Sequence, residues 1–299
     1  MKLVTPEEAV KAIPDHSIAI MPGGCARASG FYHALVDEIE RFEDLTLCSG
    51  FSFSPYTYLE RGLGINTRYV TWQASPRTRE LFTQPDPRKV GFVPIRVSDL
   101  HRVVSADGEI KPNVVVVQTS IPQADGHVSL GISVGANLDF IRSADLVIAE
   151  MNRNMPVTRG NSRVALEAID LAYESGESLC EYETPAEQPD EAKIIDNVMS
   201  LVKDGAWAQL GIGSVPDRIM ERLSDVRGVN LYSGLLTGGL QTFIEKSSTA
   251  PRIIVGELAG TRSFYDFCNE NVTIEMAPTS VTHNIAEVGA LPKFTSINS

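Results

Sequence analysis

The stretch that decides the fold is WAQLGIGSVPDRIMERL at Trp207–Leu223, followed by VNLYSGLLTGG at Val229–Gly239. An apolar run ends in a glycine-rich turn, an amphipathic segment follows, and a second apolar run comes next. This order predicts a strand, a glycine turn, a helix and a second strand.

The N-terminal part of the chain shows the same alternation. A helix is predicted to begin at Thr5, because a proline and a capping-box glutamate follow it. A further helix is predicted over Phe31–Phe42, and short apolar runs predict strands at Ser17–Met21, Leu45–Cys48, Val114–Val117 and Leu146–Glu150. Apolar strands that alternate with amphipathic helices predict an α/β protein with mainly parallel sheets.

Comparison of the chain with itself indicates a duplication. The similar segments are EAVKAIPDHSIAIMPGG (8–24) with NVMSLVKDGAWAQLGIG (197–213), LTLCSG (45–50) with VNLYSG (229–234), and RYVTWQASPRTRELF (68–82) with RIIVGELAGTRSFYDF (252–267). We therefore expect two similar open α/β domains, with a boundary in the acidic, proline-containing stretch 181–191. The predicted domains are 1–185 and 186–299, and the second copy is incomplete because it stops where its next strand should begin.

Composition limits the classes of function. The chain has 299 residues and a formal net charge of −12, which argues against a nucleic-acid partner. No apolar run reaches the roughly 20 residues of a membrane span, and the N-terminus does not resemble a secretory signal. Unpaired, scattered cysteines fit a reducing compartment, so a cytoplasmic protein is expected. The histidines are dispersed, and no metal site is predicted.

Five short motifs follow one another along the chain. They are P-x-x-D-G-x-x-S-L-G at Pro122–Gly131, I-A-E-x-N at Ile148–Asn152, M-P-x-T-x-G-x-S at Met155–Ser162, Q-L-G-I-G-x-x-P-D at Gln209–Asp217 and G-T-x-x-x-Y-D-F at Gly260–Phe267. Each is weak alone, but their shared order covers most of the chain. Together they resemble the acetyl-CoA hydrolase/transferase family, which includes the 4-hydroxybutyrate and butyrate CoA-transferases.

The resemblance implies a ping-pong enzyme that uses acyl-CoA and a carboxylic acid as substrates and holds no tightly bound cofactor. In such enzymes a glutamate attacks the thioester and then carries CoA, while backbone N–H groups hold the developing oxyanion. The site is expected in the cleft between the two halves. The residues assigned to acyl-CoA or oxyanion binding are Gly211, Ile212, Gly213, Gly238 and Gly239, and those that could line the cleft are Gly23, Gly24 and Cys25. At each glycine a plain tight turn is an equally good interpretation.

The family's nucleophile lies in a stretch like H-T-E-M-F-S-D-G. Without gaps this stretch falls on Tyr232–Gly239, so that Gly234 takes the place of the glutamate and Gly238 that of the aspartate. The internal repeat supports this alignment, because LTLCSG also ends in a glycine, Gly50. Loss of a covalent nucleophile removes most of the rate enhancement, so the ordinary transfer reaction is not expected from this chain alone.

Three interpretations of the function remain open. A homo- or hetero-oligomer is expected, and the chain could work as one subunit of a hetero-oligomer whose partner supplies the glutamate and the missing C-terminal portion. It could act on a CoA thioester by altered chemistry, with a water, a substrate carboxylate or one of three residues, Cys25, Ser233 or His127, in the reacting role. It could also be a catalytically silent CoA-binding or scaffold protein.

Overall fold

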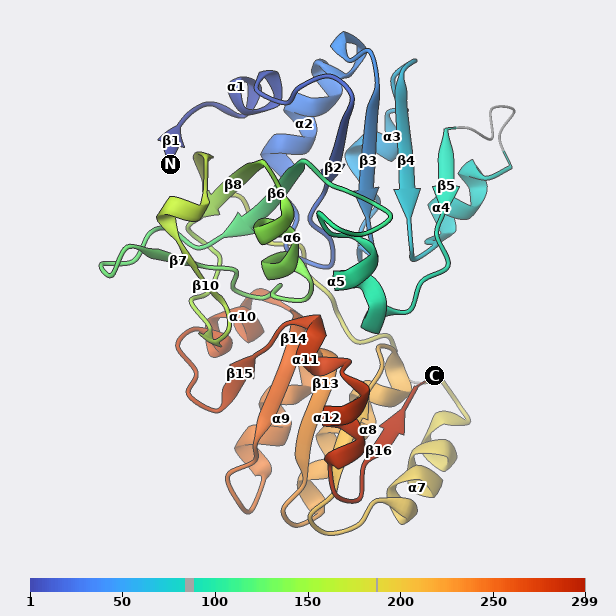
Figure 1. Ribbon diagram of the computed structural model, residues 1–299. Helices are drawn as coiled ribbons and strands as arrows, with labels where there is room; N and C mark the ends of the chain where they lie inside the picture. Colours follow the sequence, from blue (N-terminus) through green and yellow to red (C-terminus); the bar gives the residue numbers. More distant parts are fainter. Residues whose placement is uncertain (84–88, 187, 299) are drawn as a thin grey trace.

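The computed structural model describes residues 1–83, 89–186 and 188–298, and in this part of the chain two parallel sheets dominate (Figure 1). The first sheet lies in the half drawn in blue and green. Its strands, in spatial order, are β1 (Lys2–Leu3), β11 (Leu171–Ser175), β8 (Leu146–Asn152), β6 (Val114–Thr119), β2 (Ser17–Ile20), β3 (Leu45–Ser49), β4 (Thr67–Thr71) and β5 (Val90–Phe92). All neighbouring pairs in this sheet are parallel.

The second sheet lies in the half drawn in orange and red, and its pairs are also parallel. Its strands, in spatial order, are β16 (Thr295–Ile297), β12 (Trp207–Leu210), β13 (Asn230–Thr237), β14 (Ile253–Ala259), β15 (Ile274–Met276) and β9 (Arg159–Gly160). A small antiparallel pair consists of β7 (His127–Ser129) and β10 (Arg163–Ala165). The first half of the chain therefore supplies β9, an edge strand of the second sheet.

Helices connect the parallel strands, as crossover connections require. In the first half they are α1 (Pro6–Lys11), α2 (Ser29–Asp37), α3 (Thr57–Glu60), α4 (Pro76–Leu81), α5 (Leu100–Val103) and α6 (Asn137–Ser143). In the second half they are α7 (Glu191–Leu201), α8 (Ser214–Arg222), α9 (Gly239–Lys246), α10 (Arg262–Cys268), α11 (Thr279–Thr282) and α12 (Ile285–Ala290). Short 3₁₀ turns lie at Ile39–Arg41, Val97–Asp99, Leu166–Ala168 and Leu223–Asp225.

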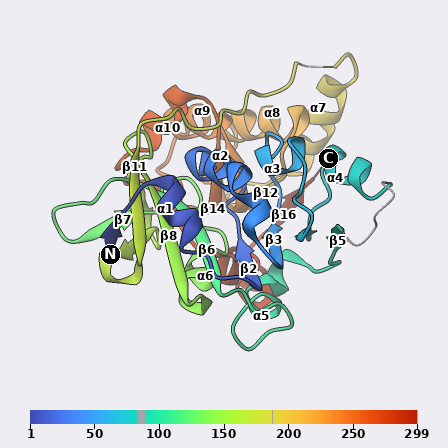
Figure 2. The ribbon, with the colours of Figure 1, turned by 90° about the horizontal axis from the view of Figure 1, so that it is seen from above.

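Strand β6 shows how the first sheet is covered on both faces. Val114 and Val116 belong to one hydrophobic cluster, and Val115 and Val117 belong to another. All four are at most 1% exposed, as expected for successive side chains that point to opposite faces of a buried parallel strand. Figure 2 shows α2 and α3 on one side of this sheet and α5 and α6 on the other.

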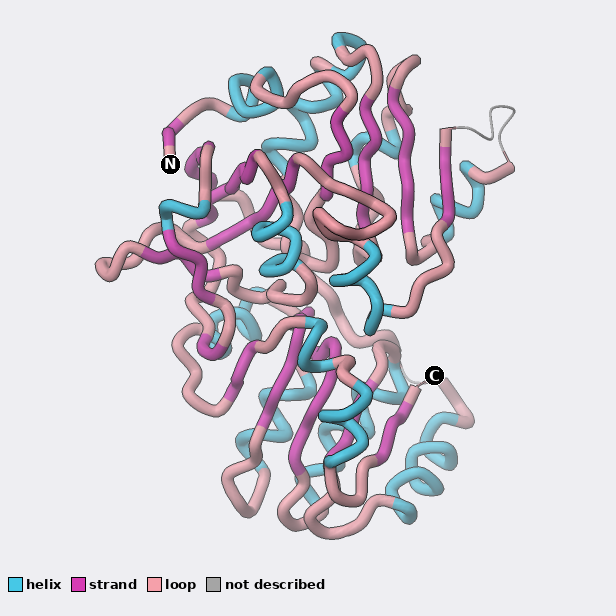
Figure 3. The backbone as a smooth tube through the Cα atoms, viewed as in Figure 1, coloured by secondary structure: helices cyan, strands magenta, loops and turns pink. Residues whose placement is uncertain are grey.

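The strand order confirms that the two halves share one topology. The series β6-β2-β3-β4-β5 in the first sheet has the same connections as β16-β12-β13-β14-β15 in the second. Figure 3 shows the two series as separate groups of strands, one above the other. Strand β16 pairs with β12 as β6 pairs with β2, so the segment before residue 299 takes the place of the next strand of the repeat. The expected α/β class with mainly parallel sheets is confirmed.

Of two local predictions, the capping box is confirmed and the extent of one helix is wrong. Thr5 caps α1, and its side chain and that of Glu8 form the reciprocal hydrogen bonds of a capping box. The helix predicted over Phe31–Phe42 is instead split into α2 and a 3₁₀ turn that ends at Arg41. Among the described residues, no helix has the length and apolar composition needed to cross a membrane.

Candidate functional site

An open cavity of about 540 Å³ lies where loops of both halves meet. Its walls include Gly23 and Gly24 after β2, Gly50 and Phe51 after β3, Trp72 and Gln73 after β4, and Gly211 and Ile212 after β12. These loops leave the carboxyl ends of parallel strands, which is where open α/β sheets bind ligands. The volume lies in the range of small-molecule sites.

The residues predicted from sequence divide into two groups. The cavity is lined by Gly23, Gly24, Gly211, Ile212 and Gly234. Its wall does not include Cys25, Gly213, Gly238 or Gly239. Gly213 and Gly238 are the N-cap residues of α8 and α9. Their roles in acyl-CoA or oxyanion binding stay predictions.

Gly234 faces His283, a residue that the sequence did not single out. A Cβ atom built on Gly234 would lie 2.8 Å from Nε2 of His283 and closer still to Cε1. The imidazole is fixed at the end of α11, because its Nδ1 lies 3.0 Å from Oγ1 of Thr282. Burial lowers the pKa of His283, so the ring is neutral at pH 7. The ring therefore fills the space that a side chain at position 234 would use.

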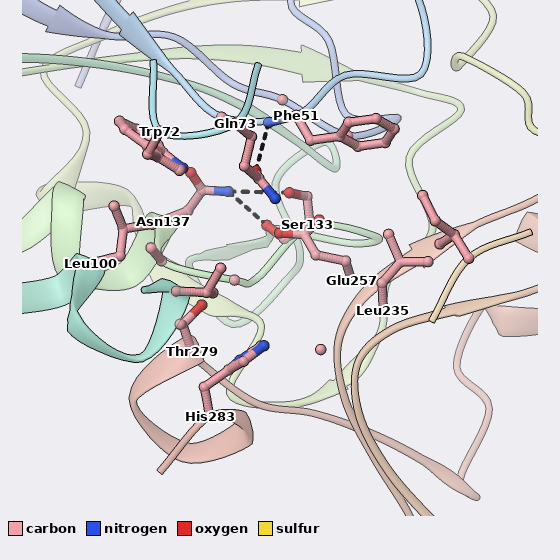
Figure 4. Close-up of a pocket in the computed structure, with 18 of the residues that line it drawn as sticks. Phe51, Trp72, Gln73, Leu100, Ser133, Asn137, Leu235, Glu257, Thr279 and His283 are labelled. Atoms are coloured by element: carbon pink, nitrogen blue, oxygen red, sulfur yellow. Dashed lines mark hydrogen bonds between the residues drawn. The ribbon is translucent and has the colours of Figure 1, made fainter. Parts of the chain in front are cut away.

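The strand next to β13 carries a carboxyl group at the cavity, that of Glu257. In the register of β13 and β14, Glu257 pairs with Leu235, one residue beyond Gly234. Figure 4 shows Glu257 and His283 at the same cavity, one on β14 and the other at the end of α11. Enclosure by protein raises the pKa of Glu257 to about 8, and a hydrogen bond with Ser133 acts in the opposite direction.

Two glycines lie beside this carboxyl group, and the absence of their side chains gives it room. A Cβ on Gly135 would collide with Oε1 of Glu257, and one on Gly24 would lie 3.5 Å from Oε2. Both glycines have positive φ, +36° and +59°, which L side chains rarely adopt. The backbone around Glu257 is thus shaped to admit a carboxyl group between the two halves.

The glutamate of the I-A-E-x-N motif has a different environment. Glu150 is fully buried and accepts hydrogen bonds from the hydroxyl of Tyr173 at 2.6 Å, the amide of Gln118 at 2.9 Å and the backbone N–H of Gly30 at 3.2 Å. A carboxylate with three donors holds strands β6, β8 and β11 to helix α2. This arrangement indicates a structural role for Glu150.

The aspartate that ends the Q-L-G-I-G-x-x-P-D motif is held in the same way. Asp217 is 1% exposed and accepts hydrogen bonds from the hydroxyls of Thr237 at 2.6 Å, Thr184 at 2.7 Å and Tyr182 at 3.2 Å. Burial raises its pKa, and the three hydroxyl groups oppose that shift. Asp217 ties α8 to the end of β13 and to the segment that joins the two halves.

The structure does not bring the three alternative reacting residues to the cavity. His127 begins β7, where its Nδ1 contacts the backbone oxygen of Asp125 at 3.0 Å, and it lines a separate hollow. Ser233 is fully buried, and its hydroxyl group lies within hydrogen-bond distance of the backbone oxygens of Leu210 and Leu235. Cys25 is 2% exposed and points toward Cys180. None of the three residues lines the cavity wall, although Glu257 is near enough to Cys25 to contribute to the raised pKa of its thiol.

Cys25 and Cys180 form a pair of free thiols. A hydrogen bond from Cys25 lowers the pKa of Cys180 to about 6, helped by Ser54 and Arg27 and opposed by burial. The same interaction and burial raise the pKa of Cys25. No cluster of three or more His, Cys, Asp or Glu side chains suited to a metal ion occurs in the described parts of the chain.

A sequence signal for Glu257 exists in the internal repeat. Alignment of RYVTWQ with RIIVGE places Gln73 opposite Glu257, and both side chains line the cavity. In the first half the amide oxygen of Gln73 accepts the N–H of Phe51 at 2.8 Å. The repeat thus has a neutral amide on one wall of the cavity and an acid on the other.

Comparison with known proteins agrees with these features. Residues 1–180 match the family described as acetyl-CoA hydrolase/transferase N-terminal domain. The 4-hydroxybutyrate coenzyme A transferase of Clostridium kluyveri is 28% identical over 306 residues, which cover 100% of this chain and 70% of that protein. The succinyl-CoA:cyclohexane-1-carboxylate CoA transferase of Geobacter metallireducens is 23% identical over 308 residues, which cover 100% of this chain and 69% of that protein.

Two solved structures share the fold. RipA from Yersinia pestis superposes with a TM-score of 0.92 at 23% identity, over 99% of this chain and 73% of that one. The 4-hydroxybutyrate CoA-transferase of Porphyromonas gingivalis gives a TM-score of 0.81 at 23% identity, over 99% and 72%. Because the family match spans more than half of the residues, the chain belongs to the acetyl-CoA hydrolase/transferase family.

Proposed function

We propose that this protein transfers CoA from, or hydrolyses, a short-chain acyl-CoA at the cavity between the two sheets. The proposal depends on one observation: loops at the strand ends of both halves meet at one cavity, and the carboxyl group of Glu257 lines it. One side-chain donor, Ser133, forms a hydrogen bond with this carboxyl group. The apolar part of the wall, formed by Phe51, Trp72, Leu100 and Phe140, suits a small acyl chain. The names of the relatives support CoA as the group transferred.

The proposal also includes the loss of the family's glutamate in this chain and the possible contribution of a partner chain. Gly234 is assigned to the position of the family's nucleophile on the gapless alignment, and the crowding by His283 supports that no carboxylate is accommodated there. An oligomer in which a partner supplies a glutamate remains an alternative source of the reacting group. Native mass spectrometry of the purified protein counts chains and bound CoA together and so tests this alternative directly. The unpaired cysteines support a reducing, cytoplasmic location.

The binding test is thermal unfolding with CoA or butyryl-CoA. A ligand present at about 100 times its Kd stabilises the folded state by about 2.7 kcal/mol, so a concentration-dependent rise in Tm is expected. Leu235→Trp, which places an indole in the cavity, should remove the rise. Val272→Trp is the matched control, because Val272 is 78% exposed before β15. An unchanged Tm of the wild type at millimolar ligand would refute the proposal.

A further inference from the structure

We propose that Glu257 is the nucleophile of this protein and that its carboxylate attacks the thioester carbonyl in place of a glutamate at position 234. This inference rests on the proposed function, since it names the reacting group of the same site. It differs from the alternative in which a partner chain provides the glutamate. The catalytic acid has then moved from strand β13 to the adjacent strand β14.

Position is the first argument. The register of β13 and β14 places Glu257 beside Leu235, next to Gly234, and all three residues line the cavity. Because successive side chains of a strand point to opposite faces, Glu257 starts from the face of the sheet opposite to that of a side chain at position 234. Its carboxyl group reaches the cavity beside Gly24 and Gly135. The carboxyl group can therefore serve the same cavity from the neighbouring strand.

Availability is the second argument. The buried carboxyl groups of Glu150 and Asp217 each accept three hydrogen bonds and fasten structural elements. One side-chain donor, Ser133, lowers the pKa of Glu257, and no cation among the described residues contributes to lowering it. Placing a carboxyl group in such an environment costs stability, and a cost of this kind concentrates at functional sites.

The space around the carboxyl group is the third argument. Gly24 and Gly135 keep the backbone of the first half close to Oε2 and Oε1 without a side chain between them. At the equivalent place of the repeat, Gln73 is occupied by a hydrogen bond to Phe51 and has no acidic oxygen. Of these two equivalent positions of the repeat, Glu257 thus presents a carboxyl oxygen to the cavity and Gln73 does not.

The covalent steps balance without an added reactant or proton. An oxygen of the Glu257 carboxylate forms a bond to the thioester carbonyl carbon, the C–S bond breaks, and CoA leaves as a thiolate with the electron pair. The thiolate then attacks the glutamyl carbonyl carbon of the mixed anhydride, and the acyl group leaves as a free carboxylate. The product is a glutamyl-CoA thioester. An acceptor acid removes CoA from it by the same two kinds of step, whereas water hydrolyses the C–S bond in one step, which restores the Glu257 carboxyl group and releases CoA as the thiol.

Trapping tests the assignment. The purified protein is incubated with butyryl-CoA, treated with borohydride or hydroxylamine, digested and analysed by peptide mass spectrometry. Modification of Glu257 is expected in the wild type. Modification of another glutamate, or of a glutamate in a co-purified chain, would overturn the assignment.

Kinetics provides the second readout. Glu257→Gln should lower kcat by about 10³-fold or more, as removal of a nucleophile does in other enzymes, while the rise in Tm with CoA persists. Glu275→Gln is the matched control, because Glu275 is exposed on the adjacent strand β15, and it should keep the wild-type rate. A Glu257→Gln variant that turns over normally would refute the inference and leave the proposed function standing, whereas absence of CoA binding in the wild type would refute the proposed function itself.

Two further measurements separate chemistry from folding and from direct attack by water. The raised pKa of Glu257 means that the folded state loses stability as pH rises from about 4.3, the ordinary glutamate value, to about 8. Glu257→Gln should therefore be at least as stable as the wild type at pH 9. In oxygen-18 water, the first turnover should release unlabelled butyrate, because its new oxygen comes from Glu257. Labelled butyrate without a trapped glutamate would show that water attacks directly and would overturn the assignment.

Discussion

The contact between Gly234 and His283 predicts a steric coupling that can be measured. In Gly234→Ala the new Cβ would lie 2.8 Å from Nε2 of His283, against 3.4 Å or more for an ordinary contact. The ring cannot retreat freely, since its backbone N–H donates to Thr279 at 3.0 Å and its Nδ1 contacts Thr282. Overpacking of this kind costs about 1–3 kcal/mol. The loss of glycine flexibility in the unfolded chain returns about 0.4–1 kcal/mol, which leaves a net destabilisation of up to about 2.6 kcal/mol.

The assay is urea unfolding of a double-mutant cycle with His283→Ala. Once the ring is absent, alanine at position 234 should be tolerated, so the double variant should be more stable than the sum of the single effects by about 1 kcal/mol or more. Gly238→Ala is the control, because a Cβ there meets no atom within 4 Å, and it should not lower stability. Additive effects within about 0.5 kcal/mol would refute the claim that His283 fills the space at position 234.

Three further predictions concern groups around the cavity and the connection between the halves. Ser133→Ala removes the hydrogen bond that favours the charged form of Glu257, so the midpoint of activity against pH should move above about 8; an unchanged pH profile would contradict this. Thr237→Val leaves the buried carboxyl of Asp217 with one donor fewer and should cost about 1–3 kcal/mol in urea unfolding, while a loss below about 0.5 kcal/mol would show that the bond is dispensable. Iodoacetamide at pH 7 should alkylate Cys180 ahead of the other three cysteines, because its pKa is lowered to about 6; preferential labelling of another cysteine by peptide mapping would disprove it.

The elements of the fold were predictable because their signals are local. The capping box at Thr5 and the β-branched run Val114–Val117 identify their structures within a few residues. The repeat of strand, glycine turn and helix also predicted the shared topology. The pairing of β9 with β15 carried no such signal, because β9 has only two residues and its partner lies more than 100 positions away.

The site was predictable only in part. Turn glycines such as Gly23 and Gly211 were expected at the cleft, since they follow apolar strands in a recognisable pattern. Glu257 and His283 were missed because their positions depend on strand register and on the docking of α11, which depend on contacts distant in sequence. The internal repeat did contain a signal for Glu257, because it aligns this residue with Gln73. Only the strand pairing shows that Glu257 reaches the cavity.

The short strand β9 has a consequence for how the protein can be divided. By covering β15, residues 159–160 keep that margin of the second sheet from offering unpaired N–H and C=O groups to other chains. A fragment cut at the connecting segment would lose this cover and expose a template for intermolecular strand addition. Expression of the C-terminal half by itself should therefore lead to self-association, and a useful dissection would carry the 159–160 segment along with it.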